Sequence, residues 1–314
     1  MKLKIKSSLP LWKLEDGITQ SMLGEFLSCR RKATLSYKKG LSSQYTSNAI
    51  TFGSLFHAAL EQIYQTDAIV VYDKLIDSLL KDYKKEVSKE RIWTFEDEEN
   101  QVLNEGYLKI LIPAYIDHYR KIDNNKTWFY IEKEFKNKWV SNIVLRGKYD
   151  RICRSNGEIW IYDTKTKSRI DPEIQNRLSF DLQIMFYMLN YSLEFDKTPV
   201  GFVYDQIKRP ALRKGSQETM KKFMQRVEAS IDDSYFQRIR VPIGRGELVR
   251  WIENEFTPMI EDFVNWATGK SVDYRNPSAC ETRYGNCKFL RWCGTADKTG
   301  LYRKKKIFSE LEMI

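Results

Sequence analysis

Residues 128–167 constrain the fold of this chain more than any other stretch. They contain three segments in which apolar and polar residues alternate: WFYIEKEFKNKWV, NIVLRGKYDRICRS and IWIYDTKTK. Such alternation is typical of strands that bury one face. Asn156-Gly157 lies between the last two segments and is a strong signal for a two-residue hairpin turn. The stretch therefore predicts a three-stranded antiparallel meander.

Apolar residues at helical spacing dominate the rest of the chain. The spacing predicts a helix capped by Thr19, a second over 49–65, three within 69–120, a buried one over 177–193, and two more over 216–232 and 245–268. The segment PVGFVYDQIKR predicts one further strand. Helices on both sides of one run of strands predict an α/β (mixed α+β) fold with a central mixed sheet flanked by helices.

Charge favours a polyanionic partner, because 52 Lys and Arg residues face 42 Asp and Glu residues, a net charge of +10. Nucleic acid is the commonest such partner. The start MKLKIKSSLPLWKLEDG lacks the apolar stretch of a signal peptide, and no run approaches the roughly 20 apolar residues of a membrane helix. Five cysteines, an odd number, do not suit a secreted disulfide framework. We therefore expect a cytoplasmic protein of a bacterial, archaeal or phage-infected cell, with no membrane partner.

The hairpin brings two carboxylates together. It places Asp150 and Asp163 nearly opposite each other on neighbouring strands, and Asp163 shares a strand face with Lys165. Two carboxylates at this spacing repel each other unless a cation lies between them, either Lys165 or a divalent metal such as Mg²⁺ or Mn²⁺. A metal held by two carboxylates beside a lysine suits phosphodiester cleavage. The alternative is an ordinary surface ion pair.

These residues resemble the PD-(D/E)XK nucleases, in particular their RecB-like exonuclease branch. Four motifs carry the resemblance, in family order: Gly53-Ser54-Leu55-Phe56-His57, Gly147-Lys148-Tyr149-Asp150, Asp163-Thr164-Lys165, and the pair Gln183 and Tyr187. One departure is that no proline precedes Asp150. Glu134 is a further acidic candidate, with a solvated strand charge as the alternative.

The resemblance implies the roles of the site residues. It implies catalytic roles for Asp150, Asp163, Lys165, Gln183 and Tyr187, and makes His57, Asp150 and Asp163 ligands of one or two Mg²⁺ or Mn²⁺ ions. Taken alone, His57 reads as a structural histidine, and the Gln-Tyr pair as buried polar groups with partners. The resemblance also implies a restriction-endonuclease-like core with a helical insertion and a C-terminal cysteine-rich segment.

Four cysteines form a separate pattern. Cys29 stands near the start, and Cys280, Cys287 and Cys293 cluster near the end. Some RecB-like enzymes, including AddB-type subunits and CRISPR-associated exonucleases, hold a 4Fe-4S cluster with this one-plus-three layout. The common C-x2-C pair is absent here, so zinc remains the alternative, and unlinked core thiols are a third interpretation. Cys153 is predicted to lie in the core, on the strand face opposite Asp150.

The predicted function is that of a metal-dependent DNA exonuclease that degrades DNA ends, preferentially single-stranded, in recombination, repair or phage DNA processing. We expect one nuclease domain over residues 1–314, with a mainly helical part over 18–125, the catalytic sheet core over 128–210, a second helical part over 211–269, and a cysteine segment over 270–295 closing on Cys29. One alternative is a non-catalytic DNA-binding subunit of a helicase–nuclease complex; another is a metal-clipped structural protein. The sequence contains no P-loop, so any unwinding must come from a helicase or recombination partner.

Overall fold

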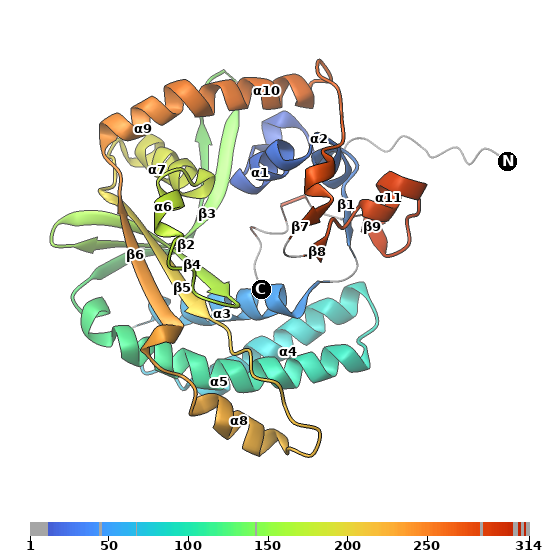
Figure 1. Ribbon diagram of the computed structural model, residues 1–314. Helices are drawn as coiled ribbons and strands as arrows, with labels where there is room; N and C mark the ends of the chain where they lie inside the picture. The colour runs from blue at the N-terminus through green and yellow to red at the C-terminus, as the bar shows by residue number, and fades with distance from the viewer. Residues whose placement is uncertain are drawn as a thin grey trace.

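A five-stranded mixed sheet forms the centre of the protein (Figure 1). The computed structural model describes residues 12–43, 46–66, 68–141, 143–282, 285–303, 307–308 and 311, so the lysine-rich start over 1–11 lies outside the described residues. In spatial order the strands are β2 (Thr127–Lys138), β3 (Val144–Ser155), β4 (Glu158–Lys167), β5 (Gly201–Lys208) and β6 (Phe236–Pro242). Strands β4 and β5 are parallel, and the other neighbouring pairs are antiparallel.

The predicted meander is confirmed as β2–β3–β4. Arg151 pairs with Tyr162 and Ser155 pairs with Glu158, so the β3–β4 hairpin turns at Asn156-Gly157 as expected. Both turn residues have positive φ, 52° and 82°, which is the conformation that a two-residue turn of this type requires.

Helices cover both faces of the sheet (Figure 1). One apolar core lies against α1 (Gln20–Ser28), α7 (Leu182–Phe195), α9 (Arg245–Trp251) and α10 (Thr257–Ala267). The core on the opposite face includes α3 (Asn48–Gln65), α4 (Tyr72–Glu90), α5 (Phe95–Asp123) and α8 (Met220–Glu228). The expected mixed α/β architecture, with a restriction-endonuclease-like central sheet flanked by helices, is confirmed.

The remaining elements are short. They are α2 (Arg30–Ala33), α6 (Gln175–Leu178), α11 (Leu290–Thr295), the β1–β9 pair (Leu41–Ser43 with Leu301–Arg303) and the β7–β8 pair (Glu281–Thr282 with Gly285–Asn286). Wider π-helical turns occupy Thr34–Lys38 and Ile252–Phe256, and 3₁₀ turns occupy Leu14–Asp16, Asp233–Tyr235 and Pro277–Ala279. Among the described residues, no helix is both long and apolar enough to span a membrane.

Several helix boundaries differ from the prediction. The three helices expected within 69–120 are two, because α5 continues without a break through Pro113. The buried helix expected from residue 177 begins at Leu182, since the Asp181 carboxylate accepts a hydrogen bond from the Gln183 amide (2.9 Å) and caps it there. The helix expected over 216–232 is the shorter α8, and the one expected over 245–268 is α9, a π-helical turn and α10.

Strand β6 was not predicted. It lies within the segment 211–269, which the sequence indicated to be helical, and it pairs with β5 along Gly201–Ile207. Its sequence, FQRIRVP, alternates apolar residues with arginines, so the period-two signal was present. The catalytic sheet therefore extends one strand beyond the predicted core over 128–210.

Candidate active site

The predicted catalytic residues gather where β3 and β4 meet α3 and α7. The register of the hairpin sets Asp150 opposite Asp163, one position beyond the Arg151–Tyr162 pair. Asp163 and Lys165 lie on the same face of β4, and Lys165 Nζ is 2.6 Å from Asp163 Oδ2. The structure therefore brings both carboxylates and the lysine into one place.

Close packing of α3 on β4 positions His57 beside Asp150. A Cβ atom at Gly53 would lie only 3.0 Å from the Thr166 hydroxyl, so glycine allows α3 to pack closely on β4. One turn later, His57 Nε2 lies 2.8 Å from the Thr164 carbonyl oxygen. Because a carbonyl only accepts hydrogen bonds, Nε2 carries the proton and donates it.

The opposite ring nitrogen of His57 faces a carboxylate. His57 Nδ1 lies 3.3 Å from Asp150 Oδ2, and burial lowers the pKa of the imidazole, against the opposing effect of Asp150. In the neutral ring, Nδ1 is then an acceptor that faces another acceptor. Two acceptors at this distance repel each other unless a proton or a metal cation lies between them.

Glu132 of β2 completes a cluster of three ligands. One ligand atom each from His57, Glu132 and Asp150 lie within 4.8 Å of one another. Glu132 has φ 47° and lies between the Ile131–Arg151 and Lys133–Tyr149 pairs of the β2–β3 ladder. Two carboxylates and an imidazole nitrogen are a donor set that suits Mg²⁺ or Mn²⁺.

Glu134 does not join this cluster. Its side chain is 54% exposed and lies 3.9 Å from the Arg146 guanidinium. The acidic residue that β2 brings to Asp150 is therefore Glu132, which the sequence analysis did not single out. Both glutamates lie in IEKEF, and only the register of β2 against β3 distinguishes them.

Burial perturbs the acidic groups of the site. It raises the pKa of Glu132 to about 8, with Asp150 adding to the effect and Lys148, 2.7 Å away, opposing it. Burial also raises the pKa of Asp163 to about 7, against the opposing charge of Lys165. Burial by itself lowers the pKa of Lys165, but Asp163 and Asp150 outweigh it and raise the pKa above its usual value. Without a cation the site takes up protons, and a divalent metal would replace them.

Helix α7 supplies the predicted glutamine and tyrosine. Gln183 Nε2 donates to Asp163 Oδ1 (2.8 Å) and lies 3.2 Å from the Tyr187 hydroxyl. The i, i+4 spacing places both side chains on the helix face that packs over the sheet. Gln183 thus leaves the other oxygen of Asp163 to face Lys165.

A buried ionic network lies beneath the site, on the opposite face of the sheet. Arg151 Nη2 donates to Thr164 Oγ1 (2.7 Å) and pairs with Asp205 Oδ2 (2.8 Å), and Arg238 Nε lies 3.1 Å from the same oxygen. The Thr164 amide in turn donates to Asp150 Oδ2 (2.8 Å). This network was not predicted from the sequence, although charged residues within otherwise apolar strands were a signal for it.

Four cysteines come together in a pocket that contains none of the active-site residues. Cys29, Cys280, Cys287 and Cys293 line one small pocket together with Phe289 and Leu290. Burial, with contributions from the other three thiols, raises the pKa of the Cys293 thiol. Cys153 lies apart from them and is fully buried, as predicted.

A mixed sheet that presents paired carboxylates, a lysine and a histidine at one end defines a metal-dependent nucleic-acid hydrolase. Residues 18–294 match the family model of the PD-(D/E)XK nuclease superfamily, and the chain belongs to this superfamily. It is therefore a nuclease, and nucleases of this superfamily use divalent metals.

Two solved structures are similar over most of their length. One, from Eubacterium rectale and described as a "putative exonuclease", is 12% identical, with 88% of this chain and 90% of that chain covered and a TM-score of 0.48. The other, SSO0001, is 14% identical, with 88% of this chain and 95% of that chain covered and a TM-score of 0.30. At this level of similarity neither structure bears on the activity. No curated protein matches the sequence significantly.

Proposed function

We propose that this nuclease is a metal-dependent exonuclease that hydrolyses phosphodiester bonds from DNA ends, with a preference for single strands. The observation that carries the proposal is the His57–Glu132–Asp150 cluster beside the Asp163–Lys165 pair. One or two Mg²⁺ or Mn²⁺ ions would be held by His57, Glu132 and Asp150, with Asp163 adjacent. Such an ion supplies an activated water and neutralises charge on the phosphate.

The protein's own groups arrange the reactants. The Lys165 ammonium stays charged, because Asp163 and Asp150 raise its pKa, and it orients the attacking water and offsets the developing charge on the phosphate. Gln183 fixes the orientation of Asp163 through its Nε2 hydrogen bond. Tyr187, whose hydroxyl accepts from Gln183 Nε2 (3.2 Å), would help Gln183 to arrange the phosphate.

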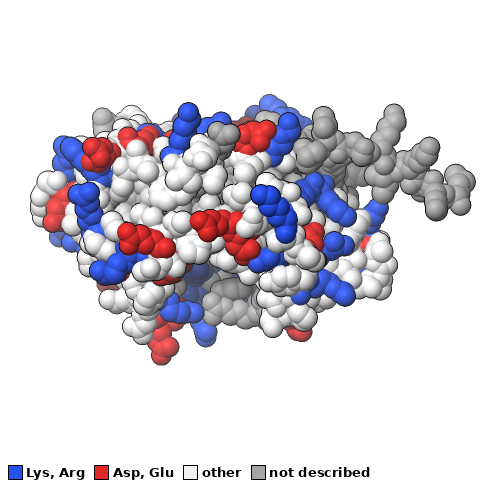
Figure 2. Space-filling view, turned by 90° about the horizontal axis from the view of Figure 1, so that it is seen from above, with Lys and Arg blue, Asp and Glu red and all other residues white. Residues whose placement is uncertain are grey.

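The exonuclease action and the DNA substrate rest on the resemblance to the RecB-like branch and on the net charge of +10. Figure 2 shows basic and acidic side chains interspersed over the face seen there, so the basic excess does not form a single stripe on that face. Recombination, repair or phage DNA processing is the proposed setting, with a helicase as a partner.

Cleavage of an end-labelled single-stranded oligonucleotide with Mn²⁺ tests the proposal. Lys165→Ala should abolish the loss of label and leave the fold intact, whereas Lys136→Ala, which removes an exposed lysine of β2, should leave activity unchanged. Cleavage of a circular single strand, which has no ends, would show that the enzyme is an endonuclease and would overturn the proposed exonuclease activity. A folded parent chain that binds DNA and never cleaves it would support the alternative, a non-catalytic DNA-binding subunit.

We further propose that Cys29, Cys280, Cys287 and Cys293 hold a 4Fe-4S cluster. Their convergence in one pocket supports the proposal. Four thiolates satisfy either zinc or an iron–sulfur cluster, and the one-plus-three layout, which resembles that of RecB-like iron–sulfur nucleases, favours the cluster. The cluster would join α1 to the 270–295 segment and make the chain one nuclease domain.

The metal content of the anaerobically purified chain tests this second proposal. We expect iron and inorganic sulfide in equal amounts, lost in Cys287→Ala and kept in Cys153→Ala, whose thiol lies outside the pocket. Zinc in place of iron, or no metal bound in any variant, would overturn it.

A further inference from the structure

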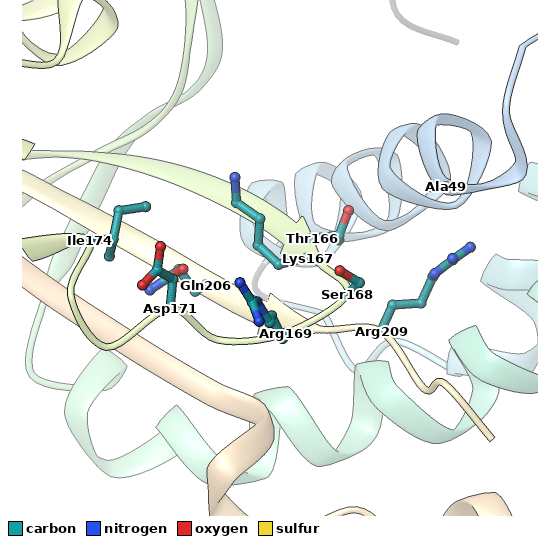
Figure 3. A pocket seen from close by; sticks show the side chains of 9 residues that line it. All are labelled: Ala49, Thr166, Lys167, Ser168, Arg169, Asp171, Ile174, Gln206 and Arg209. Atoms are coloured by element: carbon teal, nitrogen blue, oxygen red, sulfur yellow. The ribbon is translucent and has the colours of Figure 1, made fainter. Parts of the chain in front are cut away.

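A polar pocket opens directly beside the active site. It has a volume of about 480 Å³ and lies at the carboxyl ends of β4 and β5, between the loop that follows β4 and the start of α3. Figure 3 shows side chains from β4, β5 and the loops that follow them converging on it. We call it the strand-end pocket; its polar lining includes Thr166, Lys167, Ser168, Arg169, Gln206 and Arg209.

The pocket is lined by strand neighbours of the catalytic residues. Lys165 pairs with Gln206 across the β4–β5 ladder, and Lys167 follows Lys165 on the same face of β4. Consecutive side chains on one strand face are about 7 Å apart, which is close to the spacing of successive phosphates along a nucleic-acid strand. A group bound in the strand-end pocket therefore lies next to the group being cleaved.

The charge of the lining favours an anion. Lys167, Arg169 and Arg209 contribute three positive charges. The one carboxylate of the lining, Asp171, is bonded to Arg177 (3.0 Å). No carboxylate of the described residues pairs with the guanidinium of Arg169 or Arg209. Arginines without a protein carboxylate partner are suited to phosphate oxygens.

A buried amide at the base of the pocket adds a second and independent signal. Gln206 is fully buried, and its Nε2 donates to Gln237 Oε1 (2.9 Å). Its Oε1 accepts no hydrogen bond from any described residue. Leaving a buried acceptor unpaired is destabilising, so the amide is suited to a ligand that brings an N–H donor.

We propose that the strand-end pocket holds one unpaired nucleotide of the DNA strand, immediately beside the scissile phosphate. A nucleotide supplies both features, a phosphate for the arginines and a base N–H for Gln206. In a duplex those base donors are already paired, so the pocket selects a single strand or a frayed end. This proposal rests on the proposed nuclease function, and it specifies the form of substrate that the site accepts.

Binding to a catalytically silent protein tests the pocket without any need for cleavage. In the Lys165→Ala background, fluorescence anisotropy measures affinity for a single-stranded oligonucleotide in which each position in turn is made abasic. We expect one position near the bound end at which loss of the base weakens binding about fivefold, the equivalent of one hydrogen bond of about 1 kcal/mol. That effect should vanish in Gln206→Met, which removes the acceptor and keeps a similar volume. Equal losses at all positions, or none at any, would overturn the proposal.

The salt dependence of the same binding tests the arginines. Arg169→Ala with Arg209→Ala removes two phosphate contacts, so the slope of log K against log salt should fall by about 1.4, at about 0.7 for each single-strand contact. The matched control, Arg245→Ala with Arg250→Ala, removes two exposed arginines of α9 and should leave the slope unchanged. An equal fall in both double variants would mean general charge attraction and would overturn the pocket. If the parent chain never cleaves DNA but one abasic position still weakens binding, the proposed nuclease function fails and the proposed nucleotide pocket stands.

Discussion

Replacing Glu132 by glutamine tests the metal site most sharply, because protons and metal compete for the same carboxylate. Burial and Asp150 raise the pKa of Glu132 from 4.5 to about 8. The folded protein therefore holds this proton more tightly than the unfolded chain does. The contribution to stability is complete below pH 4.5, declines as pH rises, and is lost above about pH 8. At about 1.4 kcal/mol per pKa unit, the full decline is about 5 kcal/mol, an upper bound because structural relaxation reduces it.

Urea unfolding of the metal-free protein at pH 5 and pH 8 measures this decline. The wild type should lose several kcal/mol more than Glu132→Gln between the two pH values, since the amide does not ionise. At pH 8, Mn²⁺ at a hundredfold excess over its dissociation constant should stabilise the wild type by about 2.7 kcal/mol. The variant should gain little, because it lacks one ligand of the cluster.

Glu134→Gln is the matched control. Its side chain is half exposed and lies outside the cluster, so this variant should follow the wild type in both pH dependence and metal response. The reasoning is refuted if Glu132→Gln and the wild type show the same pH dependence, or if Mn²⁺ stabilises Glu132→Gln and the wild type equally.

Three further predictions follow from contacts around the site. Arg151→Met should lower the free energy of unfolding in urea by about 1–3 kcal/mol, because Asp205 and Thr164 lose a buried hydrogen-bond donor while Arg238 still pairs with Asp205. Gly53→Ala should reduce the cleavage rate, because the new Cβ atom meets the Thr166 hydroxyl at 3.0 Å, and adding Thr166→Ala should restore it. Gln183→Leu should lower kcat about 10- to 100-fold with an unchanged circular dichroism spectrum, since Asp163 loses the donor that orients it.

The local sequence was sufficient for the catalytic hairpin. Asn156-Gly157 sets the turn, and a turn of known length sets the register, so the approach of Asp150 to Asp163 was predictable. The β2–β3 connection carries no such signal. It therefore left open whether Glu132 or Glu134 meets Asp150, and the irregular backbone of Glu132 could not be read from its neighbours.

Long-range pairing explains most of the other differences. FQRIRVP lies in the segment 211–269 that was predicted to be helical, yet Arg238 is buried in β6 against Asp205 and Asp123, which lie far away in the sequence. The grouping of the four thiols, by contrast, could be expected from the resemblance. Their spacing could not, because it depends on how α1 packs against the 270–295 segment.

Thr164 occupies the position that the (D/E)XK formula leaves open, and the structure restricts it on three sides. Its amide donates to Asp150 (2.8 Å), its carbonyl accepts from His57 (2.8 Å), and its hydroxyl accepts from Arg151 (2.7 Å). Valine has the same shape but cannot accept the arginine's hydrogen bond, so a saturation library should tolerate serine at this position better than valine. Substitutions at Thr164 would then be restricted as tightly as those at Asp163 and Lys165. Exchanging the charges of Arg151 and Asp205 would remove the donor to the Thr164 hydroxyl. Such an exchange would therefore also require a change at Thr164.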